Sequence, residues 1–316
     1  MSLESLRGRS LLTLLDFSAE EICSLLNLAK GLKAEARRGE TRQRFQGKTI
    51  ALLFEKRSTR TRCAFETAFG EEGGHPVFLS TADIQLGAKE SIEDTARVLG
   101  RMFNAIQFRG FKQSTVETLA RYAGVPVYNG LTDSFHPTQA LADMQTLEEN
   151  CGPVRGKKLC FIGDGRNNVA RSLIVISAKL GVHVTVIAPP SLSPGEDLLE
   201  RCKPIAAESG AEMRVTADLS AVEGADAIYT DVWVSMGEED CREERLRLLK
   251  PYQVNQALMD KTGRKDCIFL HCLPAVKGEE VTAEVVDGPQ SRAWDEAENR
   301  KHTIKAVMLA TLGLAG

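Results

Sequence analysis

The chain has 316 residues, more than a single hydrophobic core usually reaches, so about two domains are expected. Its 43% hydrophobic and 26% charged residues are typical of a soluble globular protein, and its net charge of −3 argues against nucleic acid as a partner. No apolar run approaches the roughly 20 residues of a membrane span, and no signal peptide opens the chain. The eight cysteines form neither a C-x-x-C pair nor a zinc-like cluster with histidine, so reduced thiols in a cytoplasm are expected.

The first predicted elements are a scaffold helix and a buried strand. The helix begins at a capping box, Ser18 to Glu21, and apolar residues follow it at helical spacing. The strand is the short apolar run 49–54, and the helix after it has its own apolar face. The loop between this strand and this helix contains the sequence S-T-R-T-R at residues 58–62.

The S-T-R-T-R stretch has two interpretations. Ser58 is a natural helix N-cap, so free backbone N–H groups, a positive dipole end, two hydroxyls and two guanidinium groups would converge on one point. Such a point is a site for a phosphate dianion. Five residues of this kind are more often a capped helix with solvated arginines. Their place at the end of a buried strand favours the anion site.

A polar loop, residues 81–91, separates a short strand predicted at 76–80 from the next helix. On composition alone this loop is mobile surface. The helix behind it has Ala96, Leu99 and Met102 on one side, which predicts its packed face.

Two further strands are predicted at 105–108 and 125–128, with a helix between them. Arg109 follows the first of these strands directly. An arginine at a strand terminus is usually solvated. In an open parallel sheet, however, ligands collect outside the carboxyl ends of the strands, and Arg60 also leaves from such an end.

The loop after the strand at 125–128 leads to H-P-T-Q, residues 136–139, at the start of another helix. Pro137 suits the first helical position because its φ angle is already fixed near the helical value. By itself, His136 ahead of a helix is more often a structural hydrogen-bonding group than a catalyst. The helix runs on towards Asn150, so it can bridge two domains.

A new β-α-β unit begins with the strand predicted at 158–162. Its turn, G-D-G-R-N-N at 163–168, half-resembles a dinucleotide-binding fingerprint. Asn168 replaces the third glycine, and the strand at 182–187 ends without an acidic residue for a ribose hydroxyl. An NAD site is therefore not expected.

The strand predicted at 225–229 is followed by Asp231. A lone aspartate here is usually a cap, but together with Ser235 it could clamp an α-ammonium group, and the backbone N–H of Met236 could meet a carboxylate. The charged run 238–247 behind them is most simply a solvated lid exterior.

The last predicted strand, 267–270, ends at H-C-L-P-A, residues 271–275. A buried cysteine such as Cys272 is normally an inert small hydrophobic residue, and no base–orienter pair beside it indicates nucleophilic catalysis. The closing helix contains Arg300, which by itself would be an ordinary helix charge.

The stretch 54–62 resembles the carbamoyl-phosphate signature of the aspartate/ornithine carbamoyltransferase family. H-P-T-Q and H-C-L-P-A resemble further elements of that family. The triplet S-M-G at 235–237 resembles the mobile loop of its ornithine-using members and separates the chain from aspartate-using relatives. The resemblance runs essentially from end to end.

The resemblance implies roles for individual residues, six of them catalytic: Arg60, Arg109, His136, Gln139, Asp231 and Cys272. Carbamoyl phosphate would be held by Ser58, Thr59, Arg60, Thr61, Arg109, His136, Pro137, Thr138, Gln139 and Arg300, and by Gln85 from a neighbouring subunit. The amino acid would be held by Asn168, Asp231, Ser235, Met236, Cys272 and Leu273. Because an ammonium group of pKa about 10.4 must be deprotonated before it attacks, Asp231 with Cys272 is where that step is expected.

We therefore expect two parallel-sheet α/β domains linked by helices. Residues 1–150 would bind carbamoyl phosphate, and residues 151–316 would form a Rossmann-like ornithine domain whose C-terminal helix packs back on the first. The reaction would give L-citrulline and phosphate through a tetrahedral intermediate, in arginine biosynthesis. No metal or organic cofactor is expected, because carbamoyl phosphate is already activated. A cytoplasmic homotrimer with shared active sites, able to stack further, is implied.

Four alternatives stay open. A catabolic enzyme would run the same chemistry in arginine degradation, and a relative could use putrescine or an acylated ornithine. Putrescine lacks the α-carboxylate that Asn168 and Met236 would hold. A nucleotide-binding Rossmann protein would leave S-T-R-T-R and H-P-T-Q without a role. A non-catalytic assembly or regulatory protein is disfavoured because all the signature residues are present.

Overall fold

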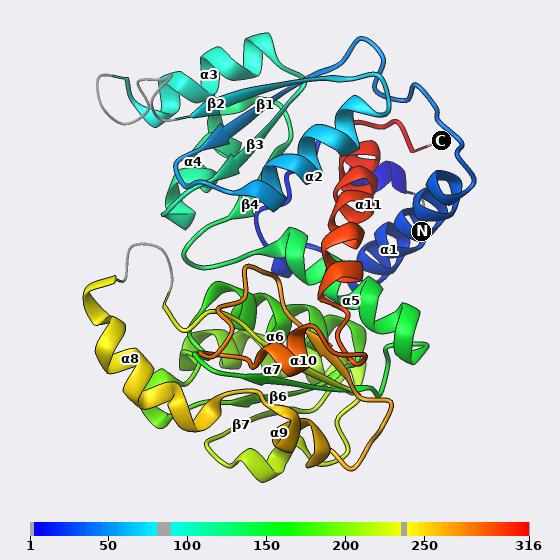
Figure 1. Cartoon of the computed structure of the whole chain (residues 1–316). Coiled ribbons are helices and arrows are strands. Elements are labelled where there is room, and N and C mark those ends of the chain that lie inside the picture. The colour runs from blue at the N-terminus through cyan, green and yellow to red at the C-terminus, as the bar shows by residue number, and fades with distance from the viewer. Residues whose placement is uncertain (1–2, 81–89, 235–238, 316) are drawn as a thin grey trace. The chain divides into compact units, whose positions relative to one another are not determined.

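The computed structural model describes residues 3–80, 90–234 and 239–315 (Figure 1). The predicted roles of Gln85, Ser235 and Met236 lie outside the described residues. The chain divides into two compact units, Met1–Ala142 with Glu298–Gly316, and Asp143–Ala297. Within the described part of the chain, we find no helix that combines the length and the apolar character needed to cross a membrane.

The first unit contains a parallel sheet of four strands in the order β2-β1-β3-β4. Its strands are β1 (Thr49–Phe54), β2 (His75–Ser80), β3 (Ala105–Arg109) and β4 (Val127–Leu131). Its helices are α1 (Ala19–Arg37), α2 (Thr59–Gly70), α3 (Ile92–Met102) and α4 (Gln113–Ala123). Buried residues of β1 and β3 form one core with α3 and α4. On β4, Tyr128 stacks instead on Phe65 of α2.

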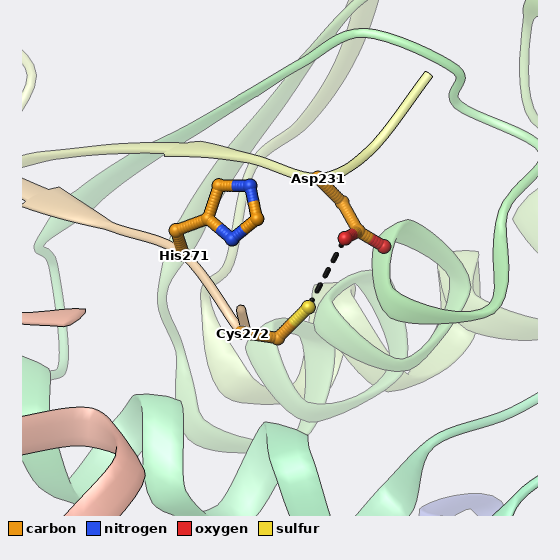
Figure 2. A group of neighbouring side chains, drawn as sticks. All are labelled: Asp231, His271 and Cys272. Atoms are coloured by element: carbon orange, nitrogen blue, oxygen red, sulfur yellow. Dashed lines mark hydrogen bonds between the residues drawn. The ribbon is translucent and has the colours of Figure 1, made fainter. Parts of the chain in front are cut away.

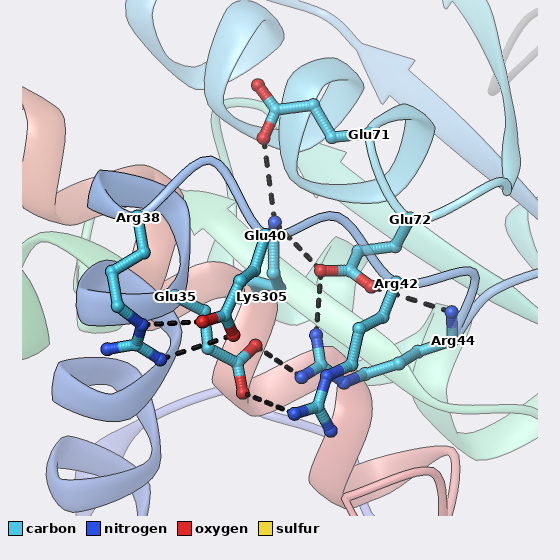
Figure 3. Close-up of polar contacts among 8 residues, drawn as sticks. All are labelled: Glu35, Arg38, Glu40, Arg42, Arg44, Glu71, Glu72 and Lys305. Carbon is cyan, nitrogen blue, oxygen red and sulfur yellow. Dashed lines mark hydrogen bonds and ion pairs between the residues drawn. The ribbon is translucent and has the colours of Figure 1, made fainter.

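Helix α11 (Ala293–Thr311) brings the end of the chain into the first unit, where it lies beside α2 (Figure 1). Figure 3 shows a network of charged side chains that joins α11 to α1 and to the residues directly after α2. Lys305 lies 3.2 Å from Glu72, and Arg44 pairs with both Glu72 and Glu35. Lys305 and Glu72 are both buried, so this network fixes the helix that carries Arg300.

The second unit contains a parallel sheet of five strands in the order β7-β6-β5-β8-β9. Its strands are β5 (Lys158–Ile162), β6 (His183–Ile187), β7 (Met213–Thr216), β8 (Ala227–Thr230) and β9 (Ile268–Leu270). Its helices are α6 (Asn168–Leu180), α7 (Glu196–Ser209), α8 (Arg242–Leu249), α9 (Gln256–Asp260) and α10 (Ala283–Val286), and α5 (Pro137–Cys151) contributes to both units. The chain order reverses between β5 and β8, and ligands of parallel sheets collect at such a switch point.

The predicted fold class, two parallel-sheet α/β domains linked by helices, is confirmed. The strands predicted at 49–54 and 158–162 have those bounds, whereas β4 starts two residues after the predicted 125 and runs to Leu131. Strand β7 was not predicted, because it is a four-residue edge strand, M-R-V-T, that lacks the continuous apolar run of a buried strand.

Two expectations about exposure were wrong. Met102 is 69% exposed, so it does not share the packed face of α3 with Ala96 and Leu99. The charged run 238–247 is not wholly solvated, because Arg245 of α8 is buried and donates to the Asp164 carboxylate. An ion pair formed with a distant turn explains this burial, and such a partner is invisible in a local charge pattern.

Candidate active site

The N-terminus of α2 has the predicted cap. Ser58 is extended (φ −163°, ψ 122°), and its hydroxyl accepts a hydrogen bond from the N–H of Thr61 at 3.2 Å. The helix therefore begins at Thr59, directly after the carboxyl end of β1. First-turn N–H groups lack partners within their own helix, so they offer donors to an anion at this point.

Thr61 is the point where arginine side chains from two distant segments meet. Its buried hydroxyl accepts a hydrogen bond from Arg109 of β3 at 3.1 Å and from Arg300 of α11 at 3.2 Å. Arg300 also donates to Thr138 of α5 at 3.3 Å. Two nearly buried guanidinium groups therefore share one hydroxyl at the end of the sheet.

Arg62, the second arginine of the S-T-R-T-R stretch, does not join them. Arg62 is exposed, lies 2.9 Å from Glu66 one turn along α2, and covers the ring of Phe78. The expected convergence of two signature guanidinium groups was wrong on this point. The additional positive charge comes instead from Arg109 and Arg300, which are distant in the sequence.

His136 lies in the field of these arginines. It is 3% exposed, and its Nδ1 lies 3.4 Å from the Thr138 hydroxyl. Burial, followed by the charges of Arg300, Arg109 and Arg60, holds the pKa of His136 well below its usual value of 6.5. At neutral pH this imidazole is therefore uncharged, and it can donate one N–H to a ligand without adding charge.

The residues around Thr61, Arg109, His136 and Arg300 form the half-site of the first unit. The remaining residues expected there are close in sequence to these. Pro137 is the first residue of α5, as predicted, and Gln139 is buried in the first turn of that helix. Thr59 is exposed at the start of α2. The first unit thus gathers Thr61, Arg109, His136, Thr138 and Arg300, with Ser58 as the cap that fixes Thr61.

The second unit presents acidic groups at the ends of its strands. Asp231 follows β8, and one of its carboxylate oxygens accepts a hydrogen bond from the Asn167 amide at 2.9 Å. The other accepts from the backbone N–H of Val232 at 2.8 Å and from the Cys272 thiol at 3.1 Å. Figure 2 shows the side chains of Asp231 and Cys272 pointing toward each other.

Cys272 is a hydrogen-bond donor in this arrangement. Burial and the neighbouring Asp231 charge raise the pKa of its thiol well above the usual value of 9. Reactive cysteines have lowered pKa values, so this environment is the opposite of the one that activates a nucleophile. Among the predicted residues, Leu273 follows Cys272 directly, and Asn168 begins α6 beside Asn167.

Asp231, His271 and Cys272 together resemble a metal site in part. Each offers one ligand atom, and these atoms all lie within 4.8 Å of one another (Figure 2). Both ring nitrogens of His271 already have hydrogen-bonding partners, the N–H of Leu273 at Nδ1 and Glu280 at Nε2. A metal ion would have to displace one of them. Local spacing could not predict this cluster, because Asp231 and Cys272 lie on different strands.

Asp231 and Cys272 form the half-site of the second unit. A pair of buried carboxyl groups, Glu296 and Asp143, lies near it. The Tyr229 hydroxyl contacts Glu296 at 3.1 Å and Asp143 at 3.4 Å. Glu296 also accepts the backbone N–H of His271 at 3.0 Å. All three side chains are fully buried or nearly so. Burial, followed by the charge of Asp143, raises the pKa of Glu296 well above its usual 4.5, so the protein favours the protonated form of this carboxyl group.

Two family models together match most of the chain. The carbamoyl-P binding domain of aspartate/ornithine carbamoyltransferase matches residues 9–149, and the Asp/Orn binding domain of the same family matches residues 155–311. The chain belongs to the aspartate/ornithine carbamoyltransferase family. The family and the enzyme class expected from the sequence, a carbamoyltransferase, are confirmed.

Similar proteins cover nearly the whole chain. A protein of Caldanaerobacter subterraneus subsp. tengcongensis named ornithine carbamoyltransferase is 67% identical over 98% of this chain and 99% of its own. A Bacillus licheniformis protein named catabolic ornithine carbamoyltransferase is 55% identical over 98% of both chains. The structure of ornithine carbamoyltransferase from Pyrococcus furiosus is 47% identical, covers 98% of each chain and superimposes with a TM-score of 0.94.

Several residues of the carbamoyltransferase half-sites were not predicted. Asn167 could have been, because an asparagine immediately before a helix is a typical N-cap, and its side chain does accept the N–H of Ala170 at 2.8 Å. Asp143 and Glu296 gave no such signal. Each is one of several acidic residues in its helix, and only the packed structure places the two beside Tyr229.

Proposed function

We propose that the chain transfers the carbamoyl group of carbamoyl phosphate to the δ-amine of L-ornithine, giving L-citrulline and phosphate. The observation that carries this proposal is the convergence of Arg109 and Arg300 on Thr61 at a capped helix N-terminus beside an uncharged His136. The names of relatives up to 67% identical over nearly the whole chain support ornithine as the acceptor.

Carbamoyl phosphate is bound by the first domain, residues 1–150. Ser58, Thr59, Arg60 and Thr61 hold the phosphate, with Arg300 and, from a neighbouring subunit, Gln85. Arg109, His136 and Gln139 polarise the carbamoyl group, and Pro137 and Thr138 fix their positions at the start of α5. Burial keeps His136 uncharged, and the arginine charges that reinforce this effect also attract the phosphate dianion.

Ornithine is bound by the second domain, residues 151–316. Asn168 and the Met236 N–H hold the α-carboxylate, Asp231 and Ser235 hold the amino group, and Cys272 with Leu273 contacts the side chain. Because Cys272 stays a protonated thiol, it orients the Asp231 carboxylate rather than accepting the proton itself.

The reaction proceeds by direct attack. The δ-ammonium group loses a proton, and the neutral amine attacks the carbamoyl carbon to give a tetrahedral intermediate. The N–H of His136 and the guanidinium of Arg109 stabilise the negative charge on its oxygen. The bond to the phosphate oxygen then breaks, phosphate leaves, and the attacking nitrogen loses its second proton. Loss of one such preorganised donor typically costs about 10²–10³ in rate.

We assign the chain to arginine biosynthesis in the cytoplasm. The relative at 67% identity carries the unqualified name, whereas the relative named catabolic is 55% identical. All eight cysteines lie in the described residues and none of them forms a disulfide there, which suits a reducing compartment. Steady-state kinetics in both directions test the assignment. Citrulline synthesis should saturate hyperbolically with carbamoyl phosphate and exceed phosphorolysis of citrulline at equal substrate concentrations.

We also propose a homotrimer in which the 81–91 loop of one subunit supplies Gln85 to the next, and such trimers can stack further. Sedimentation should give three times the mass of one chain, or a multiple of it. Gln85→Ala and Arg109→Ala trimers should each be nearly inactive, and mixed trimers should regain activity at junctions where an intact loop meets an intact Arg109. Verified mixed trimers without recovery would mean that Gln85 acts in its own chain.

A citrulline-formation assay tests the acceptor. Ornithine, putrescine, N-acetylornithine and aspartate are each offered with carbamoyl phosphate, and carbamoylated product is measured for each. Ornithine should give the highest kcat/KM, because putrescine lacks the α-carboxylate and acetylornithine has lost its α-ammonium charge. A preference for any of the other three would overturn the proposed acceptor.

A further inference from the structure

The backbone of Leu273 adopts a conformation that leucine rarely takes. Its φ angle is +59°, and it is the only residue other than glycine with a positive φ among the described residues. In this left-handed region the Cβ of a non-glycine residue crowds the backbone, at a cost on the order of 1–2 kcal/mol. Neighbouring groups must therefore hold Leu273 in place.

His271 supplies one of these groups. Its Nδ1 accepts a hydrogen bond from the backbone N–H of Leu273 at 2.8 Å. Because this N–H donates, Nδ1 carries no proton, and the imidazole proton is on Nε2. Nε2 lies 3.3 Å from the Glu280 carboxylate. His271 and Glu280 are both fully buried.

Glu280 holds both sides of the turn. The same oxygen that faces His271 accepts the backbone N–H of Val276 at 2.5 Å. The other carboxylate oxygen of Glu280 is buried and has no hydrogen-bonding partner among the described residues. A buried carboxylate that leaves one oxygen unpaired is a poor means of stabilising a fold, since apolar side chains would avoid the loss of hydration. The pair of His271 and Glu280 is better explained by the position that it gives to Leu273.

We propose that His271 and Glu280 are positioning residues that fix Leu273 and thereby set the length of amino-acid side chain that the site accepts. The inference rests on the proposed function, in which Leu273 and Cys272 contact the ornithine side chain. Glu280 selects the His271 tautomer, and that tautomer offers Leu273 an acceptor. The backbone of Leu273 is then held in one position directly after Cys272, which donates to Asp231.

Two substitutions of His271 separate its two hydrogen bonds. His271→Asn places an amide where Nδ1 was, so its oxygen can still accept the N–H of Leu273, but the contact with Glu280 is lost. His271→Gln places the amide where Nε2 was, so it can still donate to Glu280, but the Leu273 N–H is left without an acceptor. The two variants differ by one methylene, so general effects of removing the ring are shared.

The expected results concern ornithine and not carbamoyl phosphate. His271→Gln should raise the KM for ornithine about tenfold or more, the usual consequence of one buried donor without a partner. It should also lower the preference for ornithine over 2,4-diaminobutyrate and lysine, which are one methylene shorter and longer, by about tenfold. His271→Asn should recover most of both properties. The KM for carbamoyl phosphate should stay within about twofold in both variants.

His183 offers a matched control in the same unit. Its Nδ1 also accepts a backbone N–H, that of Glu212 at 3.0 Å, but at the start of β6 and not at a strand's carboxyl end. His183→Gln should leave the ornithine KM and the side-chain preference unchanged. Circular dichroism and the carbamoyl-phosphate KM check that each variant is folded.

The outcomes separate the inference from the function on which it rests. If wild-type enzyme forms no citrulline, the proposed function is wrong, and this inference falls with it. If wild-type enzyme is active and His271→Gln keeps the wild-type ornithine KM and preference, only the positioning role is wrong. Equal losses for both substrates in both His271 variants would also overturn it, because they would indicate a purely structural histidine.

Discussion

The two half-sites use the same physical effect with opposite signs. In the first unit, burial, reinforced by the charges of the arginines, lowers the pKa of His136, so the imidazole is uncharged at neutral pH. In the second, burial, reinforced by nearby acidic groups, raises the pKa values of Cys272, Tyr229 and Glu296 and favours their protonated forms. Both environments hold their titratable groups neutral, yet one is positive and the other negative.

The opposite charges of the two units indicate which kind of ligand each would bind. A cluster of guanidinium groups at a helix N-terminus suits a phosphate dianion. A carboxylate supported by an amide and a thiol suits an ammonium group. The neutral groups then supply directed hydrogen bonds without adding charge. Substitutions in each unit should therefore affect one substrate and spare the other.

The largest effect is expected for Arg60. Arg60→Lys keeps the positive charge but removes the fork that can bind phosphate through two N–H groups. We expect kcat/KM for carbamoyl phosphate to fall about 10²–10³-fold with the fold intact. Arg62→Lys is the matched control, because Arg62 is exposed and pairs with Glu66. Near-normal kinetics of Arg60→Lys would remove the phosphate assignment.

The next effect is expected in the other unit. Asp231→Asn removes the charge that would pair with an ammonium group, while an amide oxygen can still accept one of the bonds that Asp231 now receives. We expect the KM for ornithine to rise about 100-fold, in line with a hydrogen bond to a charged group. Asp218→Asn changes an exposed helix cap in the same unit and should have little effect. An unchanged ornithine KM in Asp231→Asn would contradict the acidic half-site.

Cys272 should tolerate one replacement well. Serine can also donate to Asp231, so Cys272→Ser should retain kcat/KM for ornithine within about tenfold, whereas Cys272→Ala removes the donor and should lose more. Because the raised pKa keeps the thiol protonated, the pH profile of Cys272→Ser should match that of the wild type. A pH profile that loses an ionisation on this substitution would identify a reactive thiolate and would contradict a protonated Cys272.

The smallest effect concerns stability and pH. His136 has a lowered pKa in the folded chain, so below about pH 6.5 the unfolded chain binds more protons, and folding stability falls as the pH drops further. His136→Gln cannot take up that proton. Its melting temperature should therefore fall by a few degrees less than that of the wild type between pH 7 and pH 5. Parallel curves for the two proteins would show that His136 is not held neutral.

Local signals explain most of what the sequence predicted. The Ser58 cap and the strand ends at Phe54 and Ile162 depend on a few adjacent residues, and the structure has them where expected. The direction in which a side chain points depends on distant partners. Arg245 differs from expectation because its partner, Asp164, is 81 residues away, whereas the pairing of Arg62 with Glu66 one helical turn later is a local signal that the sequence does contain.

The supporting residues of the second half-site were beyond prediction for the same reason. Glu280 reaches His271 only because the chain turns back after β9, and Glu296 and Asp143, which are far apart in the sequence, both contact Tyr229. A single buried acid in a helix leaves no periodic pattern. These residues became visible only through their burial and their hydrogen bonds.

Equilibrium binding of carbamoyl phosphate to three proteins tests the division between the two units most directly. Titration calorimetry would compare the wild type, Arg60→Lys and Asp231→Asn in the absence of ornithine. Arg60→Lys should lose affinity at least tenfold, whereas Asp231→Asn should bind as the wild type does. Equal weakening in both variants, or weakening in Asp231→Asn alone, would contradict the assignment of carbamoyl phosphate to the first unit.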